Sequence, residues 1–132
     1  MTIPHYDTVR DEPLPTDDAV LSRLDDLLEE GLALRLWFMF LDDESYQLPL
    51  LLPMDLGGAP GSDDVDAIAR FIDDLAAAVD AATAIVVVEW GDLDHAEIAV
   101  EWMRVVAAAC SQSGVDYRGP FECSPFGVRP LG

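Results

Sequence analysis

The sequence contains no lysine, so its cationic side chains are a few arginines, and Lys and Arg together number 7 against 26 Asp and Glu. The formal net charge is −19 at pH 7. A chain this anionic repels the phosphates of nucleic acids and has too few cations to displace their counterions. We therefore expect no direct binding to DNA or RNA, and anionic membrane surfaces are disfavoured for the same reason. A basic protein or a divalent cation would be attracted instead.

Targeting and redox signals are also missing. The stretch MTIPHYDTVRDEPLP has no basic segment followed by an apolar one, so no signal peptide is expected. No apolar run approaches the roughly 18 residues that cross a bilayer. The two cysteines, Cys110 and Cys123, have no CxxC or metal-type spacing and are interpreted as small apolar residues of a reduced, cytoplasmic protein.

The apolar content of the sequence is sufficient for one folded domain. Its 132 residues are 51% hydrophobic, which is typical of a globule and not of a disordered acidic tail. Three prolines and mixed charge predict a flexible N-terminal arm over residues 1–15. Residues 16–132 are expected to form a single domain.

Three stretches show the 3.6-residue apolar period of amphipathic helices, namely 16–31, 62–82 and 92–114. Each has polar residues at its start that suit a helix cap. The first and third are followed by a glycine that suits a helix end. The expected caps are Thr16 or Asp17, Ser62, and Asp92 or Asp94, and the expected stops are Gly31 and Gly114.

The strands differ in how they are expected to be buried. Residues 34–41 alternate between two apolar faces, which predicts a strand covered on both sides. A polar turn leads into a return strand, 46–52, whose Pro49 cannot donate to a ladder, so this strand is expected at a sheet edge or with a bulge. Residues 83–90 form a continuous, β-branched apolar run that is uncharged until Glu89, which predicts a central strand. A shorter strand over 115–123 and an apolar tail follow.

The order helix, hairpin, helix, strand, helix, strand contains two strand–helix–strand connections. Such crossovers join parallel strands, whereas a hairpin adds an antiparallel one. We therefore expect a three-layer α/β domain with a mixed sheet of four or five strands.

The segment LWFMFLDDESYQLPLLLPMD and the closing GVRPL resemble a group of small acidic α/β proteins from high-GC bacteria. The resemblance covers most of the chain from about Leu34, implies a compact domain and supplies no catalytic residues. The element order also resembles the zinc-dependent cytidine deaminases, and His95-Ala96-Glu97 matches their His-x-Glu motif in letters. Here that motif opens a different helix and the Pro-Cys-x-x-Cys partner is missing, so a deaminase is not expected.

In the stretch IVVVEWGDLDHAE an apolar strand ends in a group of titratable side chains. Ligands of open α/β sheets bind beyond the carboxyl ends of parallel strands. Glu89, Asp92 and Asp94 would offer oxygen ligands to Mg²⁺, Mn²⁺ or Ca²⁺ there. Alternatively, Glu89 would act as a general base with His95 as its partner. The competing interpretation, which we favour, is that Asp94 caps the next helix and forms a capping box with Glu97.

Rows of carboxylates on the first two helices are the second candidate site. Carboxylates spaced along a helix imitate a phosphate backbone and would occupy the binding surface of a nucleic-acid-binding protein. The competing interpretation is a solvated face that keeps the protein soluble. The partner-binding candidates are Asp25, Asp26, Glu29, Glu30, Asp73 and Asp74.

Together these patterns favour a non-enzymatic domain that acts by contact with a basic protein. The alternative is a small divalent-metal-dependent enzyme or ligand-binding domain at the strand end that holds Glu89. A third hypothesis is a homodimer formed through an edge strand or the apolar tail. Nucleophile motifs such as G-x-S-x-G are absent from the sequence.

Overall fold

The computed structural model describes residues 13–14, 16–28, 31 and 33–131, which form a five-stranded sheet with helices on both faces. The strand order is β2-β1-β3-β4-β5; the β3–β4 pair is parallel and the other three pairs are antiparallel. The predicted α/β class with a mixed sheet is confirmed. The elements are α2 (Asp17–Leu27), β1 (Arg35–Leu41), β2 (Gln47–Asp55), α3 (Asp64–Val79), β3 (Thr83–Glu89), the 3₁₀ turn η1 (Leu93–His95), α4 (Ala96–Gln112), β4 (Asp116–Ser124) and β5 (Gly127–Pro130).

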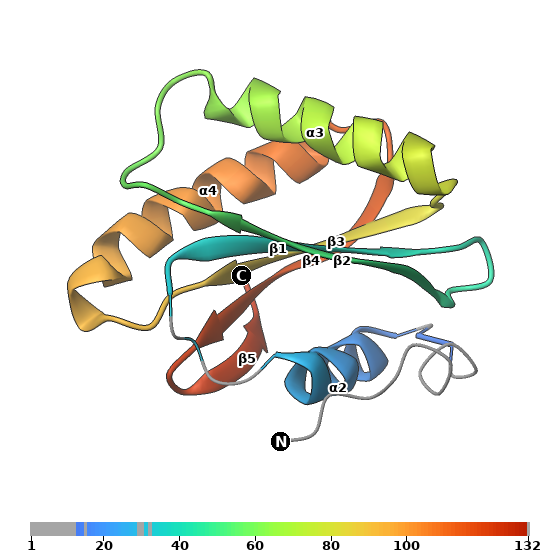
Figure 1. The fold of residues 1–132 in the computed structure, drawn as a ribbon, viewed down its shortest axis with the longest axis horizontal. Helices are drawn as coiled ribbons and strands as arrows, with labels where there is room; N and C mark the ends of the chain where they lie inside the picture. Colours follow the sequence, from blue (N-terminus) through green and yellow to red (C-terminus); the bar gives the residue numbers. More distant parts are fainter. Residues whose placement is uncertain (1–12, 15, 29–30, 32, 132) are drawn as a thin grey trace.

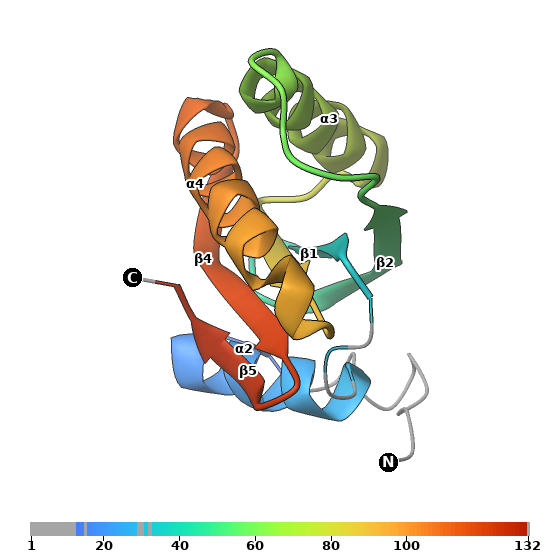
Figure 2. The same cartoon turned by 90° about the vertical axis from the view of Figure 1, so that its left-hand side faces the viewer.

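The helices are divided unequally between the two faces of the sheet. Figure 1 shows α3 and α4 on one face and α2 on the other, and Figure 2 shows the same three layers from the side. The core is divided in the same way, into a larger cluster under α3 and α4 and a smaller one under α2. The prediction of three layers is therefore confirmed, and each face of the sheet has its own apolar core.

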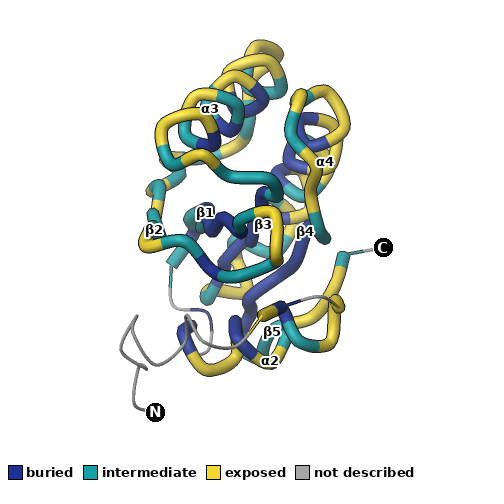
Figure 3. The backbone as a smooth tube through the Cα atoms, turned by 90° about the vertical axis from the view of Figure 1, so that its right-hand side faces the viewer, coloured by how far each residue is buried: buried dark blue, intermediate teal, exposed yellow. Residues whose placement is uncertain are grey.

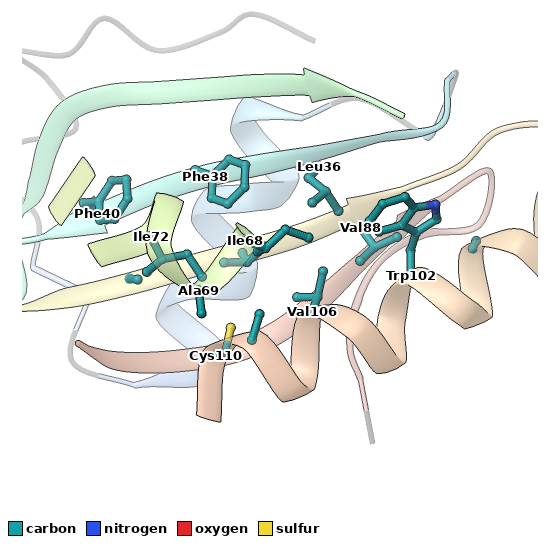
Figure 4. Close-up of a cluster of buried hydrophobic side chains, with 14 of the residues drawn as sticks. Leu36, Phe38, Phe40, Ile68, Ala69, Ile72, Val88, Trp102, Val106 and Cys110 are labelled. Atoms are coloured by element: carbon teal, nitrogen blue, oxygen red, sulfur yellow. The ribbon is translucent and has the colours of Figure 1, made fainter. Parts of the chain in front are cut away.

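Strand β1 supplies side chains to both cores, as its alternating pattern predicts. Leu36, Phe38 and Phe40 point toward α3 and α4, where Figure 4 shows them among the helix side chains. Met39 and Leu41 belong to the cluster under α2. Strand β3 is buried along nearly its whole length, and Figure 3 shows the buried residues gathered on the inner strands and the inner helix faces. The prediction of a central β3 is confirmed.

Strand β2 lies at an edge of the sheet, as Pro49 predicts. Its pairing with β1 shifts between the partners of Met39 and Leu41, and Pro49 lies in the part of β2 opposite that shift. Both expected consequences of Pro49, an edge position and an irregular ladder, are confirmed. Strand β5 is the other edge, and it arises from the tail that the pattern left without a strand.

A proline faces outward at each edge of the sheet. The backbone N–H of Leu56 donates inward, next to β1, and since donors alternate along a strand, the nitrogen of Pro53 faces outward. The N–H of Leu131 likewise donates to β4, so the nitrogen of Pro130 faces outward. An edge without these donors pairs poorly with another strand. The proposed homodimer stays a prediction, but strand addition at these edges is disfavoured.

The predicted helix caps are confirmed in part. The Oγ1 of Thr16 accepts a hydrogen bond from the backbone N of Ala19 at the start of α2, at 3.2 Å. The predicted Ser62 cap is wrong, because α3 begins at Asp64 and has no side-chain cap. Asp64 instead turns back and accepts from the backbone N of Gly61 at 2.6 Å.

Gly31 is a point of close contact and not the stop of the first helix, which ends earlier, at Leu27. Its backbone N donates to the carbonyl of Ser124 at 2.9 Å. A Cβ at this position would lie 2.0 Å from the carbonyl oxygen of Trp90. Gly31 therefore lies directly against the ends of β3 and β4, and only glycine fits at this position.

The folded domain includes Leu14, which precedes the predicted domain boundary at residue 16. Leu14 is buried in the cluster under α2, and its backbone N donates to the carbonyl of Ser45 at 2.8 Å. The rest of the predicted arm, residues 1–12 and 15, lies outside the described residues.

Candidate functional site

Glu89 ends β3 with its carboxylate inside the protein, and its exposed fraction is 4%. One carboxylate oxygen accepts from Arg35 Nε at 2.5 Å and from Trp37 Nε1 at 2.8 Å. The other accepts from the backbone N of Ala33 at 3.1 Å. Both partner side chains come from β1, where Arg35 is the register partner of Glu89. The carboxylate is thus held by an ion pair and two neutral donors, which is the environment of a structural group and not of a free general base.

In the acidic loop after β3, the capping hydrogen bond is not made by the residues of the predicted capping box. Asp92 Oδ1 accepts from the backbone N of Asp94 at 2.9 Å and so begins the η1 turn. Helix α4 follows with His95 at its N-cap and without a side-chain cap bond. The predicted capping box of Asp94 and Glu97 is therefore wrong, whereas Asp92 does cap this segment.

The predicted metal ligands are not gathered around one point. Glu89 is buried and turned inward, whereas Asp92 and Asp94 are exposed in the loop. Among the described residues, no group of three or more His, Cys, Asp or Glu side chains is placed to hold a metal ion. The site for Mg²⁺, Mn²⁺ or Ca²⁺ therefore stays a prediction that this geometry does not favour.

A second buried glutamate lies on the neighbouring strand, and sequence reasoning missed it. Glu122 of β4 is 2% exposed. Its Oε2 accepts from Trp90 Nε1 at 2.7 Å, and its Oε1 accepts from Arg129 Nε of β5. Trp90, directly after β3, is buried as well, and its indole N–H points at this carboxylate.

A pocket opens beside Glu122, on the face of the sheet that α3 and α4 cover. Its volume is about 350 Å³, and it lies between α4 and the β4–β5 hairpin. Trp90 and Glu122 line it from the strand ends, and Arg129 lines it from β5. The pocket thus occupies the carboxyl end of the parallel pair, where ligands of open α/β sheets bind.

The predicted partner-binding acids do not form one surface. Asp25 and Asp26 are exposed on α2, whereas Asp74 is exposed on α3, across the sheet (Figure 1). Asp73 is used within the fold, since it accepts from Ser113 Oγ at 2.7 Å and from the backbone N of Gly114 at 2.9 Å. The remaining two candidates, Glu29 and Glu30, lie outside the described residues.

The exposed face of α2 differs from the other helices in having no positive charge. Its one arginine, Arg23, is 4% exposed and donates to Gln47 Oε1 at 2.7 Å. By contrast, α3 and α4 carry the exposed cations Arg70 and Arg104. Among the described helices, α2 therefore presents the most uniformly negative surface.

The two cysteines are buried and unpaired with each other. Burial raises the pKa of the Cys110 thiol to about 11 and that of the Cys123 thiol to about 12, and the charge of Glu89 adds to the second effect. Thiols with such pKa values are protonated at neutral pH and make poor nucleophiles and metal ligands.

Comparison of the chain with protein families, curated proteins and solved structures found no match. The resemblance to small acidic proteins of high-GC bacteria accordingly stays a prediction. In the described part of the chain, the helices are too short or too polar to cross a membrane.

Proposed function

We propose that this chain is a cytoplasmic, non-enzymatic domain that binds a basic protein through the solvent face of α2. The observation that carries the proposal is the composition of that face. Its exposed side chains are acids and hydroxyls only. They are Thr16, Asp17, Asp18, Ser22, Asp25 and Asp26.

The negative charge of this face is not compensated within the described part of the chain. The two ion pairs there are those of the buried Glu89 and Glu122. The aspartates of α2 make no ion pair with the described residues. An uncompensated surface charge attracts a partner of opposite sign over several ångströms and fixes its orientation.

The position of two acids argues for a role other than stability. Asp25 and Asp26 lie in the last turn of α2, at the negative end of the helix dipole. Acids at that end weaken a helix, and the last turn has no basic residue to offset them. Contact with a cationic partner would remove this unfavourable interaction.

A nucleic-acid-binding protein is the kind of partner that this surface suits. Asp18 and Asp26 are eight residues apart, which corresponds to about 12 Å along a helix axis. A row of carboxylates of that length faces several cations of a phosphate-binding surface at once. The domain would then compete with nucleic acid for the same surface.

The test compares two variants of equal charge. Asp18→Asn/Asp25→Asn/Asp26→Asn removes three acids from α2, and Asp63→Asn/Asp74→Asn/Glu101→Gln removes three exposed acids from the α3 and α4 layer. Both change the net charge from −19 by +3, to −16. A partner captured from the native cell at low salt would be purified and titrated with the parent and both variants.

We expect the α2 variant to bind roughly tenfold more weakly, because three exposed charge pairs of about 0.5 kcal/mol each are lost. The control variant should bind like the parent, and all affinities should fall as salt rises. Equal weakening of both variants would mean that net charge, and not α2, determines binding. An affinity independent of salt would contradict the proposal altogether.

A further inference from the structure

The pocket beside Glu122 has walls that suit the body of a small organic molecule. Its volume of about 350 Å³ falls within the range of small-ligand sites, which begins at about 300 Å³. Val100 of α4 is 44% exposed, so apolar surface of the pocket faces water. The apolar lining residues are Ala96, Val100, Met103, Pro130 and Leu131.

Arg129 gives this pocket one oriented positive charge. Its Nε is held by the buried carboxylate of Glu122, whose other oxygen is held by Trp90. The two terminal nitrogens of Arg129 have no partner among the described residues, and the side chain is 70% exposed. A guanidinium fixed through Nε presents its Nη1–Nη2 edge as a planar pair of donors.

We infer that this pocket binds a small organic acid, with its carboxylate on the Nη edge of Arg129 and its apolar body against Val100 and Met103. A carboxylate matches the two parallel donors of that edge. An amine would find both oxygens of Glu122 already accepting hydrogen bonds. A neutral ligand would leave the guanidinium edge without a partner.

This site is independent of the contact proposed for α2, because the pocket and α2 lie on opposite faces of the sheet. The net charge of −19 repels anions at long range, so attraction depends on Arg129 alone. For a ligand of about eleven heavy atoms, a dissociation constant on the order of 1 mM is expected.

The test uses 3-phenylpropionate as the probe and two analogues with the same skeleton, 3-phenylpropanol and 3-phenylpropylamine. Binding would be followed by ¹H–¹⁵N NMR at constant ionic strength through the indole N–H resonance of Trp90, which lines the pocket. We expect a saturable shift with the acid and at least about tenfold weaker binding of the alcohol, because the charge-assisted bidentate contact is lost.

Two variants test separately the contribution of the Glu122–Arg129 charges and that of the pocket volume to binding. Val100→Trp fills the pocket without changing the Glu122–Arg129 pair and should abolish binding of all three compounds. Glu122→Gln with Arg129→Gln removes both charges together, so that no buried charge is left unpaired, and should weaken only the acid. Tyr117→Trp places the same side chain outside the pocket lining and should bind like the parent.

The inference is overturned if the acid and the alcohol bind equally, if the amine binds more tightly than the acid, or if 20 mM acid leaves the Trp90 resonance in place. Binding by Val100→Trp at the parent affinity would also overturn it. The dispersion of each NMR spectrum shows whether a variant is folded, and the double glutamine variant keeps the test valid should Val100→Trp not fold.

Discussion

Glu89 and Glu122 stand on neighbouring parallel strands, one register position apart, and their carboxylates point to opposite faces of the sheet. Glu89 is the register partner of Cys123, whose side chain lies in the cluster under α2, whereas Glu122 is the partner of Val88, which faces α3 and α4. Each glutamate accepts one arginine Nε and one indole N–H. The same arginine–glutamate–tryptophan arrangement therefore occurs on both faces at one end of the sheet.

Replacing Glu89 with Gln should destabilise the protein by about 2–3 kcal/mol, because it leaves Arg35 without a counter-charge in a mostly buried position. The value lies below that of a fully buried pair because the Arg35 side chain is 27% exposed and still reaches water. Urea unfolding at pH 7 measures the change. Glu101→Gln, at an exposed position of α4, is the control and should stay within about 0.5 kcal/mol of the parent. A loss below 1 kcal/mol for Glu89→Gln would mean that this ion pair contributes little.

Glu89→Gln combined with His95→Ala also tests the metal site predicted from the sequence. Because Glu89 already accepts from Arg35, we expect Mn²⁺ to shift the melting temperature of the parent and of this double variant equally. Differential scanning fluorimetry at matched ionic strength measures both shifts. A shift present in the parent and absent in the variant would instead support a metal ion at this strand end.

Gly31→Ala should destabilise the protein by about 3 kcal/mol or more, because the new methyl group meets a backbone carbonyl that has no room to move. The Cβ would lie 2.0 Å from the oxygen of Trp90 and 2.8 Å from that of Cys123. Gly57→Ala is the matched control, since a Cβ there meets no heavy atom within 4 Å. Thermal and urea unfolding compare the two. Similar stabilities for both variants would show that Gly31 does not keep its close contact with Trp90 and Cys123 in solution.

The free energy of unfolding should fall as pH rises from 9 toward 11. Unfolded thiols ionise near the ordinary value of 9.0, whereas the folded pKa values are about 11 for Cys110 and about 12 for Cys123. In that window the unfolded state binds fewer protons, so stability decreases by up to about 1.4 kcal/mol per pH unit for each thiol. Urea unfolding of the parent and of Cys110→Ala/Cys123→Ala across this range isolates the effect. The double variant should lose this part of the slope, and identical slopes would show that the thiols are not responsible.

Two pairs of aspartates on α2 should affect stability differently. Asp25→Asn/Asp26→Asn removes charge from the negative end of the helix dipole, and Asp17→Asn/Asp18→Asn removes it from the positive end. We expect the first variant to be more stable than the second by about 1 kcal/mol at low salt. The two variants have equal charge and the same kind of substitution. The difference should shrink in about 1 M NaCl, where the Debye length is about 3 Å; a difference of the opposite sign would contradict the dipole argument for α2.

The parts of the fold that follow a local period could be predicted from the sequence. The alternation of β1 and the continuous apolar run of β3 predict how these strands are buried, and Pro49 predicts the edge position of β2. Each of these signals lies within a few neighbouring residues of the sequence. Strand β5 escaped prediction because it is only four residues long, contains a glycine and a proline, and depends on pairing with β4.

The candidate site was harder to predict because its partners are far apart in the sequence. Trp90 and Glu122 are 32 residues apart, and Arg23 and Gln47 are 24 apart. In a chain with 26 acidic residues, nothing local distinguishes the buried Glu122 from the solvated acids around it. The charges of the acidic loop after β3 are adjacent in sequence and therefore predict a site there, whereas the pocket is lined by Glu122 of the next strand, β4, and by Arg129 of β5.

The outward-facing nitrogens of Pro53 in β2 and Pro130 in β5 affect how readily this domain aggregates at high concentration. About half of its residues are hydrophobic, the edge strand β2 is rich in leucine and the central strand β3 is rich in valine, a composition that favours fibril growth through exposed sheet edges. Pro53 and Pro130 interrupt the row of outward backbone donors on both edge strands, so copies of the chain cannot readily pair into a continuous sheet. The surfaces that remain open to other molecules are the two helix-covered faces of the sheet and the pocket beside α4.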